Sequence, residues 1–451
     1  MSVDVSDVET GRVKWSSYQK YVLALLILVY VCNYIDRQII AILSPAIKED
    51  LGLTDTQLGL SKGFAFALVY GLCGFGIARL ADRKSRVNII STCLALWSGM
   101  KVLCGVAQNF SQLLLARMGV GIGEAGCNPP AHSLISDYFP KKERATALGF
   151  YSLGISFGSL FGILLGGVLA ATFGWRWAFV IVGVPGILLA LIVKATLREP
   201  KRGGMEFKRA SADVSKGMAA ASAEPMPEFT KSFEILWKIK SYRVLCISAG
   251  LTAFCGYAFA LWMVDFLVRT HELTYAQLTL PLAFVIGIGG GIGTVAGGYI
   301  TDYFGRKDES LYFTIPAWIH IASVPLFLVA LWIGSPTLVF VFWFFMFMLH
   351  NAVAGPYYGL IQNLSPLKLR AFGAALFFFI LSMIGVGLGP FYIGALSDVL
   401  IPRFGEADAL RWALTTLAPI WVIAAVIMLN ARKALPADLA MQSDETVQKF
   451  A

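Results

Sequence analysis

The sequence predicts an all-α membrane protein in which twelve transmembrane helices form two pseudo-symmetric six-helix bundles. The first observation behind this prediction is composition, since 57% of the 451 residues are hydrophobic and only 14% are charged. The second is that about twelve apolar segments follow one another, each near the roughly 20 residues that a spanning helix needs. The third is a short loop with an Asp and several basic residues that occurs twice, with its Asp at positions 82 and 302. A repeat at half the chain length indicates two similar halves, and paired membrane halves are typical of secondary transporters.

Each half of the chain supplies six predicted spans. Those of the first half cover residues 18–43, 54–79, 87–107, 110–138, 143–172 and 176–197. Those of the second half cover residues 242–269, 275–302, 310–333, 336–363, 369–400 and 410–432. We therefore expect an N-terminal bundle at 18–197 and a C-terminal bundle at 242–432, with cytoplasmic tails at 1–17 and 433–451.

The stretch between the two halves, residues 198–241, differs in composition from everything around it. Its first part is polar and rich in small residues without a helical period, which is typical of a flexible cytoplasmic linker. Residues 229–240 then combine apolar and basic side chains, which predicts an amphipathic helix lying on the inner leaflet. The alternative is a plain helical start to the seventh span.

A glycine occurs at every fourth residue of the fifth span, at Gly154, Gly158, Gly162 and Gly166. Residues four apart lie on one face of a helix, so this face has no side chains and predicts close contact with a neighbouring helix. Small residues of this kind permit helices to rock against each other, but they do not name a substrate.

The net charge of +9 is explained by basic residues in the short loops on one side of the membrane. Arg83, Arg144 and Arg370 belong to these loops, whereas the opposite loops are poorer in Lys and Arg. Because Lys and Arg concentrate in cytoplasmic loops, we expect both termini in the cytoplasm. The minimal outer loops favour a bacterial inner (plasma) membrane. A nucleic-acid-binding surface is the weaker interpretation of the charge.

No motif in the sequence indicates a cofactor, a metal centre or a nucleic-acid site. The seven cysteines fall within apolar segments without short paired spacings, and the four histidines are scattered. The spacings of a zinc protease and of a phosphate-binding loop do not occur. We therefore expect neither enzyme activity nor ATP drive, and an ion gradient is the expected energy source.

Four charged residues stand out inside the predicted spans, where an ionised side chain is costly and marks a functional site by default. They are Asp36 and Arg37 in the first span and Arg117 and Glu124 in the fourth. Arg117 and Glu124 share one helix face about 10 Å apart, because seven residues separate them. Three neutral polar residues extend the charged faces of these two spans: Asn33, Tyr34 and Asn128. Both helices are predicted to line the N-terminal side of a central cavity.

These four charges sum to zero when both carboxylates are ionised. Protonation of Asp36 or Glu124 leaves the two arginines in excess, which attracts a phosphate or a carboxylate. We expect Glu124 to be the titrating group, because burial favours its neutral form, whereas Asp36 is held charged by the adjacent Arg37. The alternative is a permanent neutral network that only locks the first and fourth spans together.

The seventh span carries Asp265 and Arg269 four residues apart, near its outer end. The local interpretation is an i,i+4 ion pair. The other interpretation makes Arg269 an outer gate or a second headgroup contact from the C-terminal bundle. Tyr357 and Tyr358 are further candidates for polar contacts in a C-terminal wall that is otherwise rich in aromatic residues. A polar N-terminal wall opposite an apolar C-terminal wall suits an amphipathic substrate.

The repeated loop resembles the Gly-x-x-x-Asp-Arg-x-Gly-Arg-Lys pattern of the major facilitator superfamily. The second copy, Gly298 to Lys307, departs from it only by Tyr303 in place of the Arg. The first copy keeps its Asp and basic residues but has Ala78 and Ser85 where Gly is usual. Together with the two halves, the resemblance covers nearly the whole chain and implies the major facilitator fold.

Two further stretches are similar to the Spinster branch of that superfamily. They are Asn33-Tyr34-Ile35-Asp36-Arg37 in the first span and Arg117-Met118-Gly119-Val120-Gly121-Ile122-Gly123-Glu124-Ala125 in the fourth. The Spinster resemblance implies a lysophospholipid or sphingoid phosphate as substrate, with proton coupling. It also modestly favours the gating or headgroup role of Arg269.

The repeated loops are predicted to act as inner gates. Asp82 is expected to bond Arg370 when the inner side is closed, and Asp302 with Arg306 to mirror this contact near Arg144. Arg83 and Arg86 complete the basic side of the first loop, and Asp265 belongs to the outer gate. The alternative for each loop is charge that only sets the topology.

We therefore expect a proton-coupled carrier of an amphipathic lipid-like molecule that works by alternating access. Its expected partners are the bilayer, the substrate and protons, and we expect a monomer without cofactors. One alternative is a proton-coupled symporter or antiporter of small organic anions or drugs. A membrane enzyme and a sensor that binds without translocation are the other classes to exclude.

Overall fold

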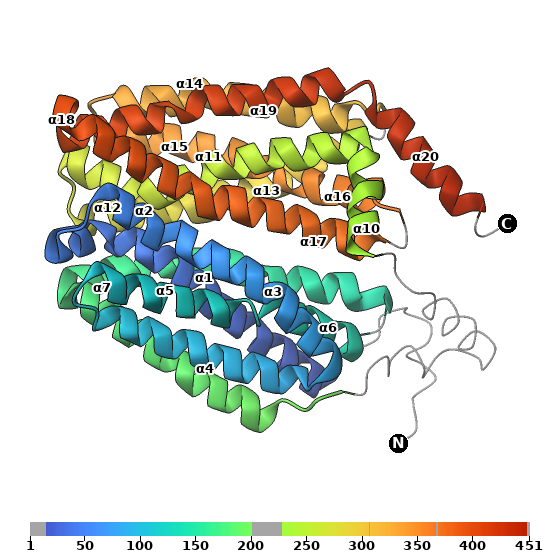
Figure 1. Ribbon diagram of the computed structural model, residues 1–451, viewed down its shortest axis with the longest axis horizontal. Coiled ribbons are helices and arrows are strands. Elements are labelled where there is room, and N and C mark those ends of the chain that lie inside the picture. The colour runs from blue at the N-terminus through green and yellow to red at the C-terminus, as the bar shows by residue number, and fades with distance from the viewer. Residues whose placement is uncertain (1–14, 140, 201–227, 306, 367–368, 449–451) are drawn as a thin grey trace.

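The computed structural model describes residues 15–139, 141–200, 228–305, 307–366 and 369–448. Every regular element within these ranges is a helix, which confirms the predicted all-α fold class. The helices run along the long axis of the molecule in two groups, with the N-terminal bundle in the lower half of Figure 1 and the C-terminal bundle above it.

The elements of the N-terminal bundle follow the predicted spans in order. They are α1 (Ser17–Leu51), α2 (Asp55–Gly59), the π-helical η2 (Leu60–Phe64), α3 (Ala65–Arg83), α4 (Arg86–Gly105), α5 (Phe110–Glu124), α6 (Asn128–Tyr138) and α7 (Lys141–Thr196). The first helix continues past its predicted end at residue 43 and stops at Gly52, whose φ of 61° is left-handed. A left-handed glycine is a common helix terminator because it carries no Cβ.

The C-terminal bundle repeats this order. It comprises α11 (Lys240–His271), α12 (Tyr275–Ala283), η3 (Phe284–Gly289), α13 (Gly290–Gly305), α14 (Leu311–Trp332), α15 (Pro336–Ala352), α16 (Ala354–Leu364), α17 (Arg370–Ile380), η5 (Leu381–Leu388), α18 (Gly389–Thr415) and α19 (Leu417–Ala431). Two short helices flank it, α10 (Phe229–Lys238) and α20 (Leu435–Gln448).

Eight helical segments of the described chain are long and apolar enough to cross a membrane. Two of them, Thr146–Thr196 and Phe372–Ala431, have 51 and 60 residues, well beyond the roughly 20 of a single span. α7 is broken at Gly174 (φ 78°, ψ 168°) and α18 at Gly405 (φ 75°, ψ 168°), a conformation that essentially only glycine adopts. These matching breaks agree with the internal repeat, and the count of twelve spans stays a prediction.

The two ends of the molecule are distinguished by the elements that lie there (Figure 1). We call them the α2 end, where α2 and α12 begin, and the α10 end, where α10 and α20 lie. Helix α10 occupies most of the predicted amphipathic segment, with Leu236 fully buried and Phe229 62% exposed. An extended residue, Ile239, separates it from α11. Its position on an inner leaflet stays a prediction, and the linker residues 201–227 lie outside the described ranges.

The glycine face of the fifth predicted span packs directly against α1. A Cβ added to Gly158 would lie 2.5 Å from Tyr34 Cβ and 2.7 Å from the carbonyl oxygen of Val31. One added to Gly162 would lie 2.8 Å from Gln38 Cβ. The predicted close helix contact is therefore confirmed, and it fixes α1, the element that carries half of the central charges.

The two bundles approach each other most closely toward the α2 end. A Cβ on Gly63 of η2 would lie 2.1 Å from the carbonyl oxygen of Val386 in η5. On the other side of the interface, a Cβ on Gly167 of α7 would lie 1.8 Å from Thr279 Oγ1 in α12. Gly63 permits the backbones of the two bundles to touch, and Gly167 leaves room for the Thr279 side chain. These contacts close the α2 end.

Candidate functional site

The centre of the N-terminal bundle holds an ion pair between α1 and α5. Arg37 Nε donates to Glu124 Oε2 at 3.0 Å. The Glu124 carboxylate is fully buried, whereas 20% of the Arg37 side chain is exposed. Arg37 is therefore the member of the pair that is open to solvent, while Glu124 depends on it for its charge balance.

Arg117, one of the four charges predicted from sequence, lies close to this pair. Its Nε donates to the carbonyl oxygen of Ser61 at 3.3 Å. Its guanidinium lies 5.6 Å from the centre of the Phe66 ring, and that of Arg37 lies 5.3 Å from the same centre. The structure thus brings both arginines to one aromatic ring, within the range of cation–π attraction.

Asp36 belongs to a different pair from the one expected. Its fully buried carboxylate forms an ion pair with the ammonium of Lys101 on α4, and Lys101 is only 3% exposed. The expectation that adjacent Arg37 holds Asp36 charged is therefore wrong, because Arg37 turns to Glu124 instead. Lys101 was missed, although the criterion that found the other charges, a charge within an apolar segment, also applies to it.

The neutral polar residues predicted beside these charges are placed differently from one another. Asn33 is fully buried, and neither side-chain polar atom has a hydrogen-bond partner among the described residues. Tyr34 lies with its ring 5.2 Å from the Arg37 guanidinium. Asn128 Oδ1 accepts a hydrogen bond from the Tyr151 hydroxyl at 2.8 Å. Tyr34 therefore borders the central ion pair.

Arg269 crosses from the C-terminal bundle to Asp55 of the N-terminal bundle. Two parallel hydrogen bonds of 2.7 Å join its guanidinium to both carboxylate oxygens. The distance from Arg269 Nη2 to Oδ1 of Asp265, its local i,i+4 neighbour, is 3.6 Å. Ser397 also donates to Asp55 at 2.7 Å. The dominant partner is therefore the one across the interface, which matches an end-closing contact better than a purely local pair.

Asp265 is also shared between the bundles. Lys62 Nζ of η2 lies 2.6 Å from Asp265 Oδ2, and both side chains are fully buried. Ser44 of α1 donates to the same oxygen at 2.7 Å. Lys62 further lies 3.8 Å from the centre of the Trp262 ring. Lys62 and Asp55 were not identified as site residues from sequence, although Lys62, like Lys101, is a charge within a predicted span. Nothing in their spacing indicates a partner in the other half.

The first repeated loop is tied down within the N-terminal bundle. Arg86 donates to Asp137 Oδ2 at 2.5 Å and to Glu199 Oε1 at 2.7 Å. Burial of the Glu199 carboxyl opposes its ionisation, but hydrogen bonds from the Val87 N–H, Arg86 and Ser85 outweigh this and lower the pKa of Glu199. The loop is thus fastened to the ends of α6 and α7.

The other predicted inner-gate residues are Arg83, Arg144, Arg370, Asp82, Asp302 and Arg306. Arg83 and Arg370 are exposed, and Arg144 donates to the carbonyl oxygen of Ser136 at 2.6 Å. The side chains of Asp82 and Asp302, and residue Arg306, lie outside what the structure describes. Their bonds across the inner end stay predictions.

The two tyrosines of the predicted C-terminal wall have opposite surroundings. Tyr357 is 4% exposed, and its hydroxyl lies 2.8 Å from His320 Nε2 in the bundle core. A buried hydroxyl needs such a partner, so Tyr357 is a core residue here, which corrects its expected place on a substrate-facing wall. Tyr358 is 46% exposed and stays a candidate contact.

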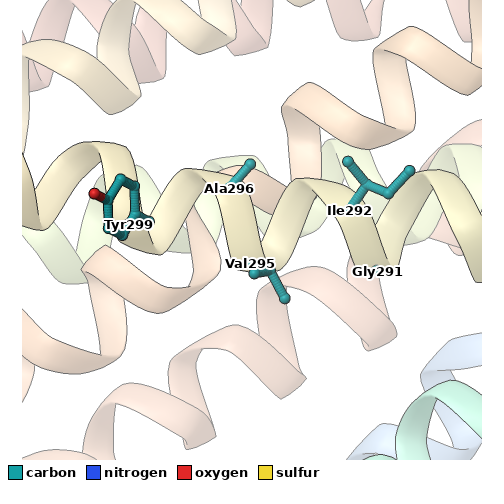
Figure 2. A pocket seen from close by; sticks show the side chains of 5 residues that line it. All are labelled: Gly291, Ile292, Val295, Ala296 and Tyr299. Atoms are coloured by element: carbon teal, nitrogen blue, oxygen red, sulfur yellow. The ribbon is translucent and has the colours of Figure 1, made fainter.

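A groove of about 620 Å³ follows one face of α13 (Figure 2). Its lining is almost entirely apolar: Gly291, Ile292, Val295, Ala296 and Tyr299. One turn before the groove, an added Cβ on Gly287 would lie 3.2 Å from Leu160 of α7. Along that same stripe Val295 and Tyr299 are 75% and 72% exposed. The contact between α13 and α7 is therefore lost toward the α10 end, where an apolar surface is left open.

Comparison with known proteins agrees with this architecture. The sequence model described as Major Facilitator Superfamily matches residues 26–390. An MFS-type efflux pump of Mycolicibacterium smegmatis is 28% identical, over 94% of each chain. A probable galactarate/D-glucarate transporter of Bacillus subtilis is 29% identical, over 69% of this chain and 71% of its own.

Among solved structures, the chain is similar to a bacterial homolog of the human lysosomal transporter Spinster in an inward-facing, unoccupied conformation. The TM-score is 0.85 at 31% identity, with 94% of this chain and 99% of the other covered. The match spans both bundles, and the family consists of transporters, not enzymes. The chain therefore belongs to the Major Facilitator Superfamily and, within it, to the Spinster branch.

Proposed function

We propose that this secondary transporter carries an amphipathic, lipid-like molecule of the lysophospholipid or sphingoid phosphate class, coupled to protons. The observation that supports this most is the pairing of a cationic centre in one bundle with an open apolar groove on the other. Such a combination matches a molecule with an anionic headgroup and a long apolar chain.

The headgroup would bind where Arg37 and Arg117 both approach the Phe66 ring. Guanidinium groups bind phosphate and carboxylate oxygens with paired, charge-assisted hydrogen bonds. Arg37 is the exposed member, with a fifth of its side chain open, so it would meet the headgroup first. Tyr34, whose ring lies 5.2 Å from Arg37, would border the same position.

The apolar chain would lie along α13. The groove there has a volume of about 620 Å³, within the roughly 300–1,000 Å³ typical of small-molecule sites. Its open side lets a long chain extend beyond it, which a closed cavity would prevent. The exposed Val295 and Tyr299 would therefore contact the chain of the substrate.

Glu124 is the group that would couple protons to the headgroup. With Glu124 ionised, Arg37 is committed to the 3.0 Å ion pair. A proton on the carboxyl would remove this attraction and free the guanidinium for an anionic group. Proton binding and headgroup binding would then support each other, as linkage between two sites requires.

Alternating access would use the interface at the α2 end. The bundles are joined there by the Arg269–Asp55 and Lys62–Asp265 ion pairs, which would have to break for that end to open. We infer that the α2 end faces outward and the α10 end faces the cytoplasm, in a bacterial inner membrane. The similarity to a Spinster homolog in an inward-facing conformation supports this orientation.

A second candidate is a carrier of small organic anions such as sugar acids. The similarity to a probable galactarate/D-glucarate transporter favours it. A sugar acid would use the same arginines but would not need the groove on α13. The two candidates therefore differ in their dependence on that groove.

Uptake of labelled lysophosphatidylglycerol and of D-glucarate into proteoliposomes would separate the candidates. The variant Val295→Trp fills the groove, and Val399→Trp is the matched control, since Val399 is 74% exposed on α18. We expect lysophospholipid uptake by the wild type and the control, and a loss of roughly tenfold or more in Val295→Trp. Uptake of D-glucarate alone, unaffected by either change, would refute the lipid assignment and favour the second candidate.

A further inference from the structure

The core of the N-terminal bundle contains more positive than negative groups. Away from the α2 end, where buried Asp55 pairs with Arg269, its two buried carboxylates are Asp36 and Glu124. Each forms an ion pair with a different cation, Lys101 and Arg37 respectively. Arg117 has no carboxylate within ion-pair distance in the part of the chain that the structure describes. Its described contacts are the carbonyl oxygen of Ser61 and the ring of Phe66.

This count differs from the balance of four charges that the sequence indicates. Lys101 is the fifth group, and it neutralises the carboxylate that would otherwise offset Arg117. With both carboxylates ionised, the core therefore carries one positive charge in excess. A buried charge without a counter-charge is strongly unfavourable, and Arg117 is only 3% exposed.

We propose that Lys101 sets the charge of the substrate by sequestering Asp36, so that with Glu124 ionised the site lacks one negative charge and binds an anion as the counter-ion of Arg117. Protonation of Glu124 releases Arg37 as a second cation for the same anion. The anion is held beside Phe66, where Arg37 and Arg117 both approach. Lys101 acts through Asp36 and does not touch the substrate, so it is a specificity-determining residue by charge balance. This inference rests on the proposed use of the central site for substrate.

The Asp36–Lys101 pair can be removed without a change in the net charge of the core. Because the pair contributes no net charge, replacing both members by neutral residues leaves the excess of one unchanged. If Lys101 were instead uncharged in the protein, Asp36 would offset Arg117 and the wild-type site would be neutral. Removing both side-chain charges would then create a preference for anions that the wild type lacks.

The test compares equilibrium binding of lysophosphatidylglycerol, which carries one negative charge, with that of zwitterionic lysophosphatidylcholine. The proteins are the wild type, the double variant Lys101→Met/Asp36→Asn and Arg117→Met, each checked for a monodisperse folded state. We expect the wild type and the double variant to prefer the anionic lipid by the same factor, roughly tenfold. Arg117→Met is expected to lose that preference.

A preference that appears only in the double variant, or one that survives in Arg117→Met, would overturn the proposal. If the double variant does not fold, the comparison of the wild type with Arg117→Met decides. Binding of D-galactonate, also a single negative charge, separates this inference from the proposed function. If it shows the same charge dependence while lysophospholipids do not bind, the charge balance stands and the lipid assignment falls. If the wild type instead binds and transports both lipids equally, the lipid assignment stands and the charge balance falls.

Discussion

Removal of the Arg269 guanidinium should open the α2 end of the transporter. In the structure its two 2.7 Å hydrogen bonds to Asp55 connect the bundles, with the Arg269 side chain 9% exposed and that of Asp55 fully buried. Truncating one partner of a buried ion pair costs about 3–5 kcal/mol. The lower limit applies to Arg269→Met, because Lys48 remains 3.1 Å from Asp55.

That cost falls on the conformation in which the α2 end is closed. About 3 kcal/mol corresponds to a change of roughly 150-fold in the ratio of closed to open molecules. If the closed state dominates in the wild type, Arg269→Met would therefore make it a minor state or remove most of its excess over the open state. The unfolding free energy should change less, since each bundle keeps its own core.

Spin labels at the exposed positions Gln108 and Thr337, one in each bundle, would measure the separation of the α2 end in a background without native cysteines. We expect the short-distance population to shrink sharply in Arg269→Met. Asp408→Asn is the control, because the Arg411–Asp408 pair lies within one bundle and is 21% and 50% exposed. Exposed pairs contribute about 0–1 kcal/mol. Identical distance distributions in Arg269→Met and the wild type would refute the assignment of this pair as the closing contact.

Three further predictions concern the interface between the bundles and the Glu199 contacts that fasten the first repeated loop. Gly63→Ala should also open the α2 end, because its new Cβ would lie 2.1 Å from the Val386 carbonyl oxygen; unchanged protease or label accessibility there would contradict this. Lys62→Met should lower the closed population more than Lys62→Arg, which keeps a charge for Asp265, and equal distance distributions in the two variants would count against the ion pair. Glu199→Gln should lower the thermal midpoint at neutral pH, since hydrogen bonds to a charged group contribute about 1.5–3 kcal/mol. Folding lowers the pKa of the Glu199 carboxyl from 4.5, so its ionised form stabilises the fold above pH 4.5 and this stabilisation is lost as the pH falls through the lowered pKa. The difference in thermal midpoint between Glu199→Gln and the wild type should therefore shrink in acid. A difference that stays constant with pH would argue against ionised Glu199.

The fold was largely predictable, because each helix that crosses a lipid bilayer needs a long apolar segment. Long apolar segments, the repeated Asp-containing loop and the glycine face of the fifth span each correspond to a feature that the structure shows. Exact helix ends were not predictable from apolarity alone. The first helix continues past its apolar run until Gly52 adopts a left-handed conformation, and that stop depends on backbone geometry.

The central charges were predictable, but their partners were not. A charge inside an apolar segment is visible in sequence, which identified Arg37, Arg117 and Glu124. The choice of partner depends on how helices rotate against each other, so the adjacent Asp36 and Arg37 face different neighbours. The same reason explains the ion pairs at the α2 end, where sequence spacing offered Arg269 only a local partner while packing supplied Asp55 from the other half.

Tyr357 shows the opposite limit of sequence reasoning. A tyrosine within an apolar span is compatible with a cavity wall and with a core, and the difference lies in a hydroxyl partner from another helix. That partner is His320, at 2.8 Å. No pattern along the chain brings these two residues together.

The central claim is that Glu124 couples protons to an amphipathic anion, and proton flux in proteoliposomes tests it most directly. Purified wild type and Glu124→Gln would be challenged with lysophosphatidylglycerol while the internal pH is recorded. The proposed mechanism predicts substrate-dependent proton movement in the wild type and its loss in Glu124→Gln, with lysophospholipid binding retained. Proton movement of equal size in both proteins, or lysophospholipid transport by the wild type without any proton movement, would contradict it.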